Sequence, residues 1–290
     1  MPELPEVETT IRGLRKHILN QEIKDVFLDA ANILKKPNNF NIFRKKIINK
    51  KIKEIKRRGK NILIVLDNNS IILAHQKISG HLLVGKWDLK NWQPKIKGPL
   101  SEPINRFIHF LIVFKTGLML ALSDVRKFAK IELWESSKEL ENSKEFKLLG
   151  PEPLEKDFTF NKFKERLKNK KGLIKKVLMD QAIVAGIGNI YSDEILWRAR
   201  INPFKRTNLL KKDEIKEIYK YIKIVLKRAI ELKGESFSDY RTPDGKKGFF
   251  DRERKAYQRT GEKCSRCKEK IIRKKIGARS THYCPRCQKI

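Results

Sequence analysis

Residues 1–18, MPELPEVETTIRGLRKHI, decide how the first part of this chain folds. The apolar residues that recur there at helical spacing are Val7, Ile11, Leu14 and Ile18. They follow Pro5, and proline suits the first turn of a helix because an N–H group there would lack an intrahelical partner. The pattern predicts a short amphipathic helix with one face toward a core.

Two pairs of β-rich runs follow this helix. Asn61 to Asp67 and Ser70 to His75 are separated by two residues and predict one hairpin. Phe107 to Phe114 and Leu118 to Ser123 are separated by three residues and predict another. Apart from His109, the first run of this second pair is apolar at both alternations, as expected for a strand covered on two faces. We therefore expect a β-sandwich packed against the opening helix.

A change of pattern marks the end of this domain. The charged stretch from Ser136 to Lys147 leads into residues 148–154, LLGPEPL, where two prolines and a glycine interrupt any regular element. Beyond it the apolar spacing becomes helical, around Leu173 to Leu178, over Ile190 to Ala199 and over Ile215 to Ile230. The second domain is therefore predicted to be helical.

The expected fold class is α+β with several domains. The predicted bounds are 1–138 for the N-terminal β-sandwich domain, 139–155 for a linker, 156–250 for the helical domain and 251–290 for a cysteine-containing finger. Apolar runs are far shorter than the roughly 18 residues of a membrane-spanning helix. The N-terminus lacks the basic and apolar regions of a secretory signal, so we expect a cytoplasmic protein without a membrane partner.

All four cysteines lie in the last segment, as two pairs: Cys264 with Cys267 and Cys284 with Cys287. This CxxC spacing, with sixteen residues between the pairs, is typical of a four-thiolate zinc site. Four ligands leave no open position for a catalytic water, so one structural Zn²⁺ is expected to fold a β-hairpin finger. The residues between the pairs are strongly basic, which favours contact with phosphates. A zinc ribbon that contacts another protein is the alternative.

The chain carries a large excess of positive charge. Its 67 Lys and Arg against 34 Asp and Glu give a formal charge of +33 among 290 residues. Such a surface attracts a polyanion, and for a cytoplasmic protein that is usually nucleic acid. An AT-biased genome would also enrich lysine at solvated positions without selection for binding. The basic clusters lie within foldable sequence, which favours a charged face over a disordered tail.

The N-terminus itself is a candidate nucleophile. A small residue after Met1 normally permits removal of the methionine, which would leave Pro2 with a free secondary amine. An α-amino group has a pKa of about 8, so a useful fraction is neutral near pH 7. Its attack on a sugar C1′ gives an iminium ion that acts as an electron sink, and Glu3 could transfer protons beside it. The simpler interpretation is that these residues only start a helix and complement its dipole.

These residues resemble the formamidopyrimidine-DNA glycosylases. Residues 1–9, MPELPEVET, look like the opening of that family, and lack the glycine that the sister endonuclease VIII branch usually has at Leu4. Further similar segments are Arg57 to Lys60, Ser79-Gly80, Asp124 to Phe128, Leu149 to Leu154, Leu178 to Gln181, Ala185 to Tyr191, Asp244 to Lys246, Arg259 to Glu262 and the finger. The resemblance covers the whole chain and implies that the helical domain is of the helix-two-turn-helix type.

The resemblance implies a bifunctional base-excision enzyme that acts on double-stranded DNA with a damaged base. Pro2 would displace an oxidised purine, such as 8-oxoguanine or a formamidopyrimidine, through a Schiff base, followed by β- and δ-elimination. Glu3 would assist opening of the sugar ring, Lys60 β-elimination, and Arg279 δ-elimination. Such an enzyme flips the damaged nucleotide out of the duplex. A partner subunit is not required for one lesion, so we expect a monomer.

Several further residues match family positions that contact or lie near DNA. Arg126 and Phe128 match residues that fill the gap left by the flipped base, with Arg126 facing the orphaned cytosine. Asn189, at a helix start, matches a phosphate contact. The other matching positions are Glu6, Ile78, His109, Lys170 and Lys175.

Some positions depart from the family pattern. Ile78 stands where a wedge methionine is usual, Lys77 where glycine is common and Val125 where proline is usual. Phe107 replaces a histidine, and Ser238 lies in a variable loop that covers the flipped base. None of these positions touches the nucleophile, so the departures bear on lesion preference and not on the chemistry.

The sequence leaves two alternative functions open. A related endonuclease VIII-like enzyme would remove oxidised pyrimidines and would also form a covalent adduct. A non-enzymatic zinc-finger DNA-binding protein would bind DNA without any adduct. The joint presence of Pro2, Glu3 and Lys60 argues against the second alternative.

Overall fold

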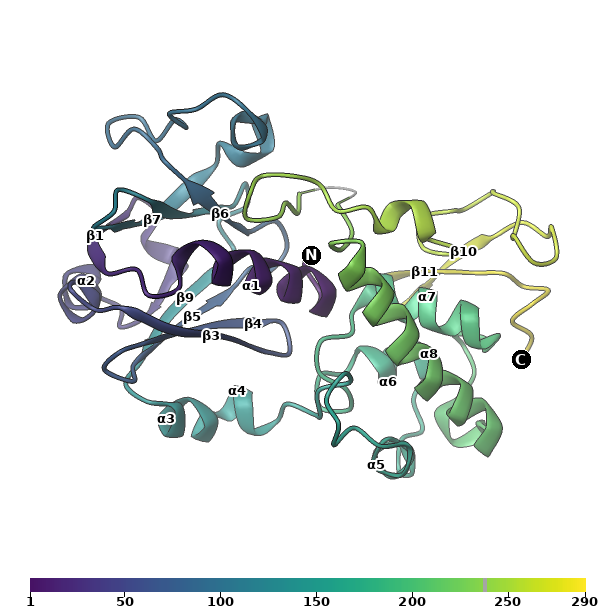
Figure 1. Ribbon diagram of the computed structural model, residues 1–290. Coiled ribbons are helices and arrows are strands. Elements are labelled where there is room, and N and C mark those ends of the chain that lie inside the picture. The colour runs from purple at the N-terminus through teal and green to yellow at the C-terminus, as the bar shows by residue number, and fades with distance from the viewer. Residues whose placement is uncertain (237–238) are drawn as a thin grey trace. The chain divides into compact units, whose positions relative to one another are not determined.

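The computed structural model describes residues 1–236 and 239–290, which form two compact units (Figure 1). Unit 1 comprises Met1–Lys147 and Leu232–Asp251. Unit 2 comprises Leu148–Glu231 and Arg252–Ile290. The domain bounds predicted above stay predictions, because a grouping by contacts need not follow the order of domains along the chain.

Unit 1 contains two β-sheets. The five-stranded sheet has the order β2-β9-β5-β4-β3, formed by Leu34–Lys36, Lys130–Trp134, Ile71–His75, Asn61–Leu66 and Ile52–Arg58. The four-stranded sheet has the order β1-β7-β8-β6, formed by Ile23–Leu28, Ile108–Phe114, Met119–Ser123 and His81–Gly85. Helices α2 (Phe40–Ile47), α3 (Ser137–Asn142) and α4 (Lys144–Lys147) complete the unit, together with the opening helix.

The opening helix α1 spans Leu4–Ile18 and contributes to the core between the sheets. All four apolar residues predicted to form its buried face have no exposed surface. They belong to one cluster with Ile64 and Ile72 of the first sheet and with Phe110 and Leu120 of the second. Burial of these side chains on both sheets stabilises the unit, at about 1.5–3 kcal/mol for each large side chain. The predicted β-sandwich with its opening helix is confirmed.

Both predicted hairpins are present, and the sequence missed several other strands. The β4–β5 and β7–β8 pairs are antiparallel, as expected. Strand β3 was not predicted, because a register shift between Ile52 and Glu54 breaks the alternation of apolar and polar residues. Its exposed positions carry lysines, so its composition also does not resemble that of a buried strand.

Unit 2 combines helices with the finger hairpin. Its helices are α5 (Phe160–Leu167), α6 (Ile174–Met179), α7 (Asn189–Ala199) and α8 (Lys212–Glu231). The antiparallel strands β10 (Ile272–Ile276) and β11 (Arg279–Tyr283) form the finger. Helix α7 ends at Ala199, as its apolar spacing predicted, and the C-cap residue Arg200 has a left-handed φ of 60°. The predicted helical domain with a hairpin finger is confirmed.

The helices were also checked for membrane-spanning length. Within residues 1–236 and 239–290, none of them is both long and apolar enough to cross a lipid bilayer.

Replacement of Ile11 by alanine tests the role of α1 in the sandwich core. Ile11 is fully buried, so Ile11→Ala is expected to lower the free energy of unfolding of unit 1 by about 2–5 kcal/mol. Ile42 on α2 is 47% exposed, and Ile42→Ala serves as the matched control with a change within about 0.5 kcal/mol. Urea unfolding measures both; equal effects of the two substitutions would contradict the proposed packing.

Candidate functional site

The start of α1 holds two buried carboxylates. Glu3 is the N-cap residue and is 1% exposed, and Pro2 before it is also buried. The Glu3 backbone N–H donates to Glu6 Oε2 over 2.8 Å, and the Glu3 side chain accepts from the N–H of Glu6 in return. This reciprocal pair satisfies two N–H groups that the helix itself leaves without partners. The predicted nucleophile and its acid therefore lie at an ordered helix start.

The segment 232–251 returns to this helix start. The Glu235 backbone N–H donates to Glu6 Oε1 over 2.7 Å, and the Tyr240 hydroxyl donates to the Glu6 carbonyl over 3.1 Å. Gly234 adopts φ +79°, and a Cβ there would lie 2.7 Å from Glu6 Oε1. Only glycine fits such a close approach in that conformation. Burial, reinforced by the charge of Glu6, raises the pKa of Tyr240 well above its usual value, so its hydroxyl stays protonated as a donor.

The turn between β3 and β4 brings Lys60 close to α1. Lys60 is 8% exposed and follows Gly59, whose φ is +56°. Arg57 donates to Glu8 Oε2 of α1 over 3.1 Å and to the Gly59 carbonyl over 3.2 Å, which fixes the turn against the helix. Burial alone would raise the pKa of Glu8, but the hydrogen bond from Arg12 and the charge of Arg57 hold it below its usual value. Glu8 therefore stays ionised as the partner of Arg57.

A partly buried histidine, His75, lies among lysines at the end of β5. Burial, together with the charges of Lys77, Lys60 and Lys130, lowers the pKa of His75 to about 3. Its neutral ring accepts the Lys77 backbone N–H at Nδ1 over 2.9 Å. Lys60 therefore lies in a region of positive potential, which suits the binding of a phosphate. No sequence motif points to this role of His75.

Two predicted DNA-contacting segments meet at one corner of unit 1. The Asp124 carboxylate accepts the Ser79 hydroxyl, the Arg126 backbone N–H over 3.2 Å and the Ala129 backbone N–H over 2.7 Å. These bonds join the segment that contains Ile78 to the loop of residues 124–129. Phe128 in that loop is 56% exposed, although burial is usual for a phenylalanine.

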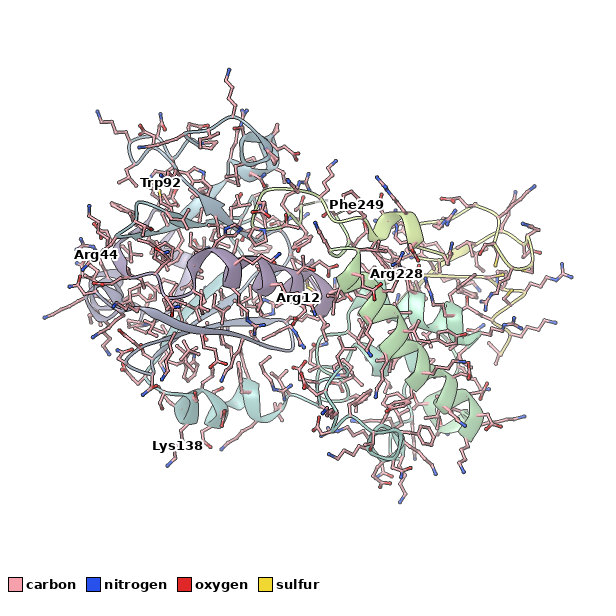
Figure 2. The ribbon with its side chains drawn as sticks, in the orientation of Figure 1. Arg12, Arg44, Trp92, Lys138, Arg228 and Phe249 are labelled. Atoms are coloured by element: carbon pink, nitrogen blue, oxygen red, sulfur yellow. The ribbon has the colours of Figure 1, made fainter. Side chains whose placement is uncertain are left out.

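The remaining predicted residues of unit 1 differ in exposure. Arg126 is exposed, and Ile78 is partly buried. His109 is 8% exposed, with Nδ1 2.8 Å from Asp29 Oδ1. Glu6 is 1% exposed, and both of its carboxylate oxygens accept backbone N–H groups of the protein. Exposed cationic side chains also extend from many other surface positions, as expected from the charge of the chain (Figure 2).

In unit 2 a tight loop leads into α7. The Gln181 side chain accepts the Gly186 backbone N–H over 2.8 Å and donates to the Ile187 carbonyl over 2.8 Å. Asn189 is the first residue of α7, and its Oδ1 is buried without a hydrogen-bond partner among the described residues. Lys170, which follows α5, is partly exposed. The N-terminal end of a helix favours an anionic group, because its N–H groups and its dipole point toward that group.

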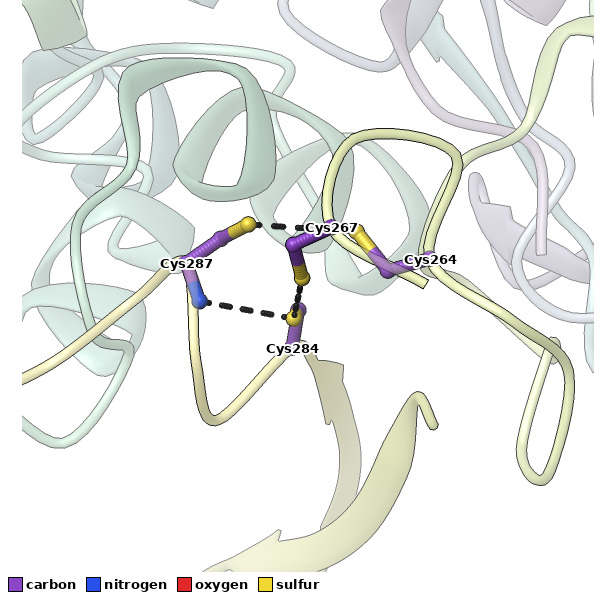
Figure 3. Close-up of side chains that lie close together, drawn as sticks. All are labelled: Cys264, Cys267, Cys284 and Cys287. Atoms are coloured by element: carbon purple, nitrogen blue, oxygen red, sulfur yellow. Dashed lines mark hydrogen bonds between the residues drawn. The ribbon is translucent and has the colours of Figure 1, made fainter. Parts of the chain in front are cut away.

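The four cysteines converge as expected for zinc. Their Sγ atoms all lie within 4.8 Å of one another (Figure 3). Burial and the neighbouring sulfurs raise the pKa of Cys287 to about 12, which indicates that the thiolates need a cation before all four ionise. The donor set and its spacing fit one Zn²⁺, which would supply structural cross-linking and no open coordination position.

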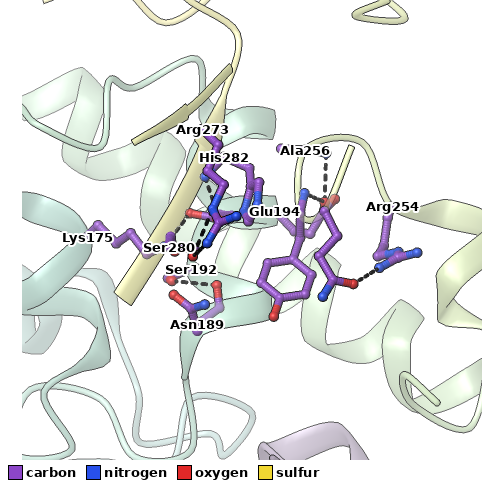
Figure 4. A network of polar contacts seen from close by, with 12 residues as sticks. Lys175, Asn189, Ser192, Glu194, Arg254, Ala256, Arg273, Ser280 and His282 are labelled. Carbon is purple, nitrogen blue, oxygen red and sulfur yellow. Dashed lines mark hydrogen bonds and ion pairs between the residues drawn. The ribbon is translucent and has the colours of Figure 1, made fainter. Parts of the chain in front are cut away.

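Two further predicted residues of unit 2, Arg279 of the finger and Lys175 of α6, differ in exposure. Arg279 begins β11 and is exposed beside the Gly277-Ala278 turn. Lys175 on α6 has no exposed surface, and its Nζ lies 2.7 Å from Asp193 Oδ1. The same Nζ donates to the Ser280 carbonyl of β11 (Figure 4). The structure thus gives Lys175 a protein partner within unit 2.

Comparisons with known proteins match this architecture along the whole chain. The matching family models are the formamidopyrimidine-DNA glycosylase N-terminal domain on residues 1–131, the formamidopyrimidine-DNA glycosylase H2TH domain on 149–241 and the zinc finger found in FPG and IleRS on 261–290. The formamidopyrimidine-DNA glycosylase of Ligilactobacillus salivarius is 38% identical over 289 residues, which cover 99% of both chains. The chain belongs to the formamidopyrimidine-DNA glycosylase family.

Other relatives agree with this assignment. The formamidopyrimidine-DNA glycosylase of Herpetosiphon aurantiacus is 38% identical over 293 residues, 99% of this chain and 100% of that protein. A mutant of Lactococcus lactis FPG, solved with DNA containing Fapy-dG, has a TM-score of 0.88 and 35% identity over 100% of both chains. The Lactococcus lactis enzyme with abasic-site DNA has a TM-score of 0.87 and 34% identity, over 99% of this chain and 100% of that one. As a member of the family, this chain is a DNA glycosylase of base excision repair.

The structure explains one departure from the formamidopyrimidine-DNA glycosylase pattern. Lys77 has a left-handed φ of +53°, which glycine adopts without steric cost, so the glycine that is common there has a conformational reason. Phe107 and Val125 are 43% and 45% exposed, so both substitutions lie at the surface of unit 1. Ser238 lies outside the described residues.

The low pKa of His75 predicts a pH-dependent stability. The unfolded chain binds a proton to this histidine below a pKa of about 6.5, whereas the folded chain does so only near 3. Stability is therefore lost as the pH falls below about 6.5, by about 2 kcal/mol between pH 7 and pH 5. His75→Asn keeps an acceptor for Lys77 but does not titrate, and urea unfolding of this variant should show a smaller loss. Parallel pH profiles of the two proteins would contradict the assignment.

Removal of zinc should affect the finger first. Trp197 is 6% exposed and belongs to one buried cluster with Cys264 and Cys284, so a chelator is expected to shift its fluorescence to longer wavelength. Elemental analysis should find one zinc per chain before chelation. Trp197→Phe is the control that removes this signal, and an unchanged emission of the wild type after complete loss of zinc would contradict the role of the metal.

Proposed function

We propose that this family member is a bifunctional DNA glycosylase and abasic-site lyase that removes oxidised purines from double-stranded DNA. The observation that carries the proposal is the start of α1, where the N-terminal Pro2-Glu3 pair is buried and held by the Glu6 carboxylate. A nucleophile and an acid in fixed positions lower the entropic cost of reaching the transition state. The formamidopyrimidine, 8-oxoguanine and abasic-site DNA in the related complexes support this substrate class.

The first step is base excision by the amine of Pro2, once Met1 has been removed. The amine attacks C1′, the bond from C1′ to the base breaks, and the departing purine takes up a proton. The sugar ring opens as Glu3 donates a proton to the ring oxygen, which leaves an iminium ion between Pro2 and C1′.

Strand cleavage then uses the iminium ion as an electron sink. Loss of a proton from C2′ breaks the bond from C3′ to oxygen, which is β-elimination. Loss of a proton from C4′ then breaks the bond from C5′ to oxygen, which is δ-elimination. We propose that Lys60 assists the first departure and that Arg279 stabilises the phosphate that leaves in the second.

Exposed and partly exposed residues are proposed to hold and distort the duplex. Arg126 would face the orphaned base, while Ile78 and Phe128 fill the gap in the stack. The 56% exposure of Phe128 supports this role, because an exposed aromatic side chain can stack on bases. Asn189 and Lys170 would contact backbone phosphates near the start of α7.

Three matched positions are proposed to act inside the protein. Glu6 and Lys175 are buried and bonded to protein groups, and His109 pairs with Asp29. We assign them positioning roles in place of the direct DNA contacts expected from the resemblance. The proposed assembly is a monomer bound to one lesion.

Borohydride trapping tests the central proposal. Protein with a free Pro2 should form a covalent adduct with a duplex that carries 8-oxoguanine opposite cytosine, because reduction fixes the iminium ion. Protein whose N-terminus is blocked by an extension should form none. Pro5→Ala alters the same helix start without touching the amine, and this control should still be trapped. Gel electrophoresis of the adducts gives the result.

The same assay separates the alternative functions. Faster trapping on a duplex with an oxidised pyrimidine would replace the proposed substrate class by the endonuclease VIII-like one. Absence of an adduct with every lesion and with an abasic site, despite tight binding, would overturn the enzymatic proposal in favour of a DNA-binding protein.

A further inference from the structure

Within the described residues, strand β11 of the finger pairs with β10 along one edge only. Two side chains from helices bond to its other edge. Along a strand, consecutive residues direct their N–H and C=O groups to opposite edges, so Ser280 and His282, two residues apart, share one edge. The Ser280 carbonyl accepts Lys175 Nζ over 2.7 Å, and the His282 backbone N–H donates to Asp193 Oδ2 over 2.9 Å. Both groups belong to the edge of β11 that faces away from β10, where a third strand would bind. The side chains of Lys175 and Asp193 thus take the place of a neighbouring strand.

Lys175 and Asp193 also form a fully buried ion pair with each other. Lys175 Nζ lies 2.7 Å from Asp193 Oδ1, and neither side chain has exposed surface. Asp193 Oδ2 also lies 3.1 Å from His282 Nδ1. Removal of one partner from such a pair leaves an uncompensated buried charge, whereas replacement of both by apolar residues is often tolerated. The pair therefore holds the backbone of β11 in one position against α6 and α7.

A second buried carboxylate, that of Glu194, bonds to the segment that leads into the finger. Glu194 follows Asp193 on α7 and has no exposed surface. Its carboxylate accepts the backbone N–H groups of Lys255, Ala256 and Tyr257 over 2.9–3.0 Å. Consecutive residues of α7 thus fix both the approach to the finger and its second strand, so the finger is attached at two points.

The Ser280 carbonyl and the His282 N–H lie close to Arg279 in the sequence. Ser280 directly follows it, and His282 lies three residues beyond it on the same five-residue strand. We infer that Lys175 and Asp193 are positioning residues that set the place of the Arg279 guanidinium through the backbone of β11. This inference rests on the proposed function, in which Arg279 stabilises the departing phosphate in δ-elimination. A guanidinium displaced by about 1 Å loses much of that stabilisation.

The test is the ratio of strand ends formed on a duplex with an abasic site. In the zinc-loaded full-length protein, K175M/D193L is expected to slow δ-elimination by about tenfold to 100-fold, so that ends from β-elimination accumulate. R279A should give the same pattern, and R279A added to K175M/D193L should cause no further loss, because the two changes remove one effect. Gel electrophoresis resolves the two kinds of ends.

A matched control and a second readout separate positioning from general damage. K205M/E214L removes another ion pair of unit 2, 2.7 Å apart, and should leave the ratio of ends unchanged. Each variant must retain one zinc per chain. Hydrogen exchange of the amides of residues 279–283 should quicken in K175M/D193L and stay at the wild-type rate in K205M/E214L.

The outcomes distinguish this inference from the proposed function. If R279A suppresses δ-elimination and K175M/D193L does not, the positioning inference is overturned and the role of Arg279 stands. Multiplicative losses in the combined variant would overturn it as well, since they would indicate independent effects. If R279A leaves the ends unchanged, the proposed role of Arg279 fails, and the inference fails with it.

Discussion

The buried carboxylate of Glu6 is the constraint on which the N-terminal site depends. It is 1% exposed, and it accepts the backbone N–H groups of Glu3 and Glu235. A desolvated carboxylate is costly unless such donors surround it, so the charge and its donors hold one another in place. Because Glu3 and Glu235 lie far apart in the sequence, one side chain orders both the helix start and the segment that returns to it.

Unit 2 also contains buried carboxylates that accept backbone N–H groups. Asp193 and Glu194 on α7 are fully buried, and each accepts backbone N–H groups from the finger or from the segment before it. Zinc would cross-link the cysteines, whereas these carboxylates bond the hairpin and the segment before it to α7. In both units, then, buried charges organise backbone, while exposed groups such as Arg126, Phe128 and Arg279 remain available to a ligand.

Much of the fold and of the candidate site was predictable, for identifiable reasons. The opening helix and both hairpins follow from regular apolar periods, and the finger follows from its cysteine spacing. Strand β3 was missed because its register shift removes the period. Glu6 and Lys175 were matched as DNA contacts, since a sequence match gives a residue's identity but not its burial. His75 carries no motif at all, and its low pKa depends on lysines brought near it by folding.

The sequence by itself determined the local elements, the metal ligands, the positive charge and the candidate nucleophile at Pro2. Each of these features depends on the types of residues that lie close together in the sequence, so it can be predicted from local chemistry. Only the tertiary structure decided which polar groups are buried and what they bond, as for Glu6 with Glu235 and Asp193 with His282. These bonds join residues about 90 to 230 positions apart, and no periodicity or motif records such a contact, because it exists only once the chain has packed.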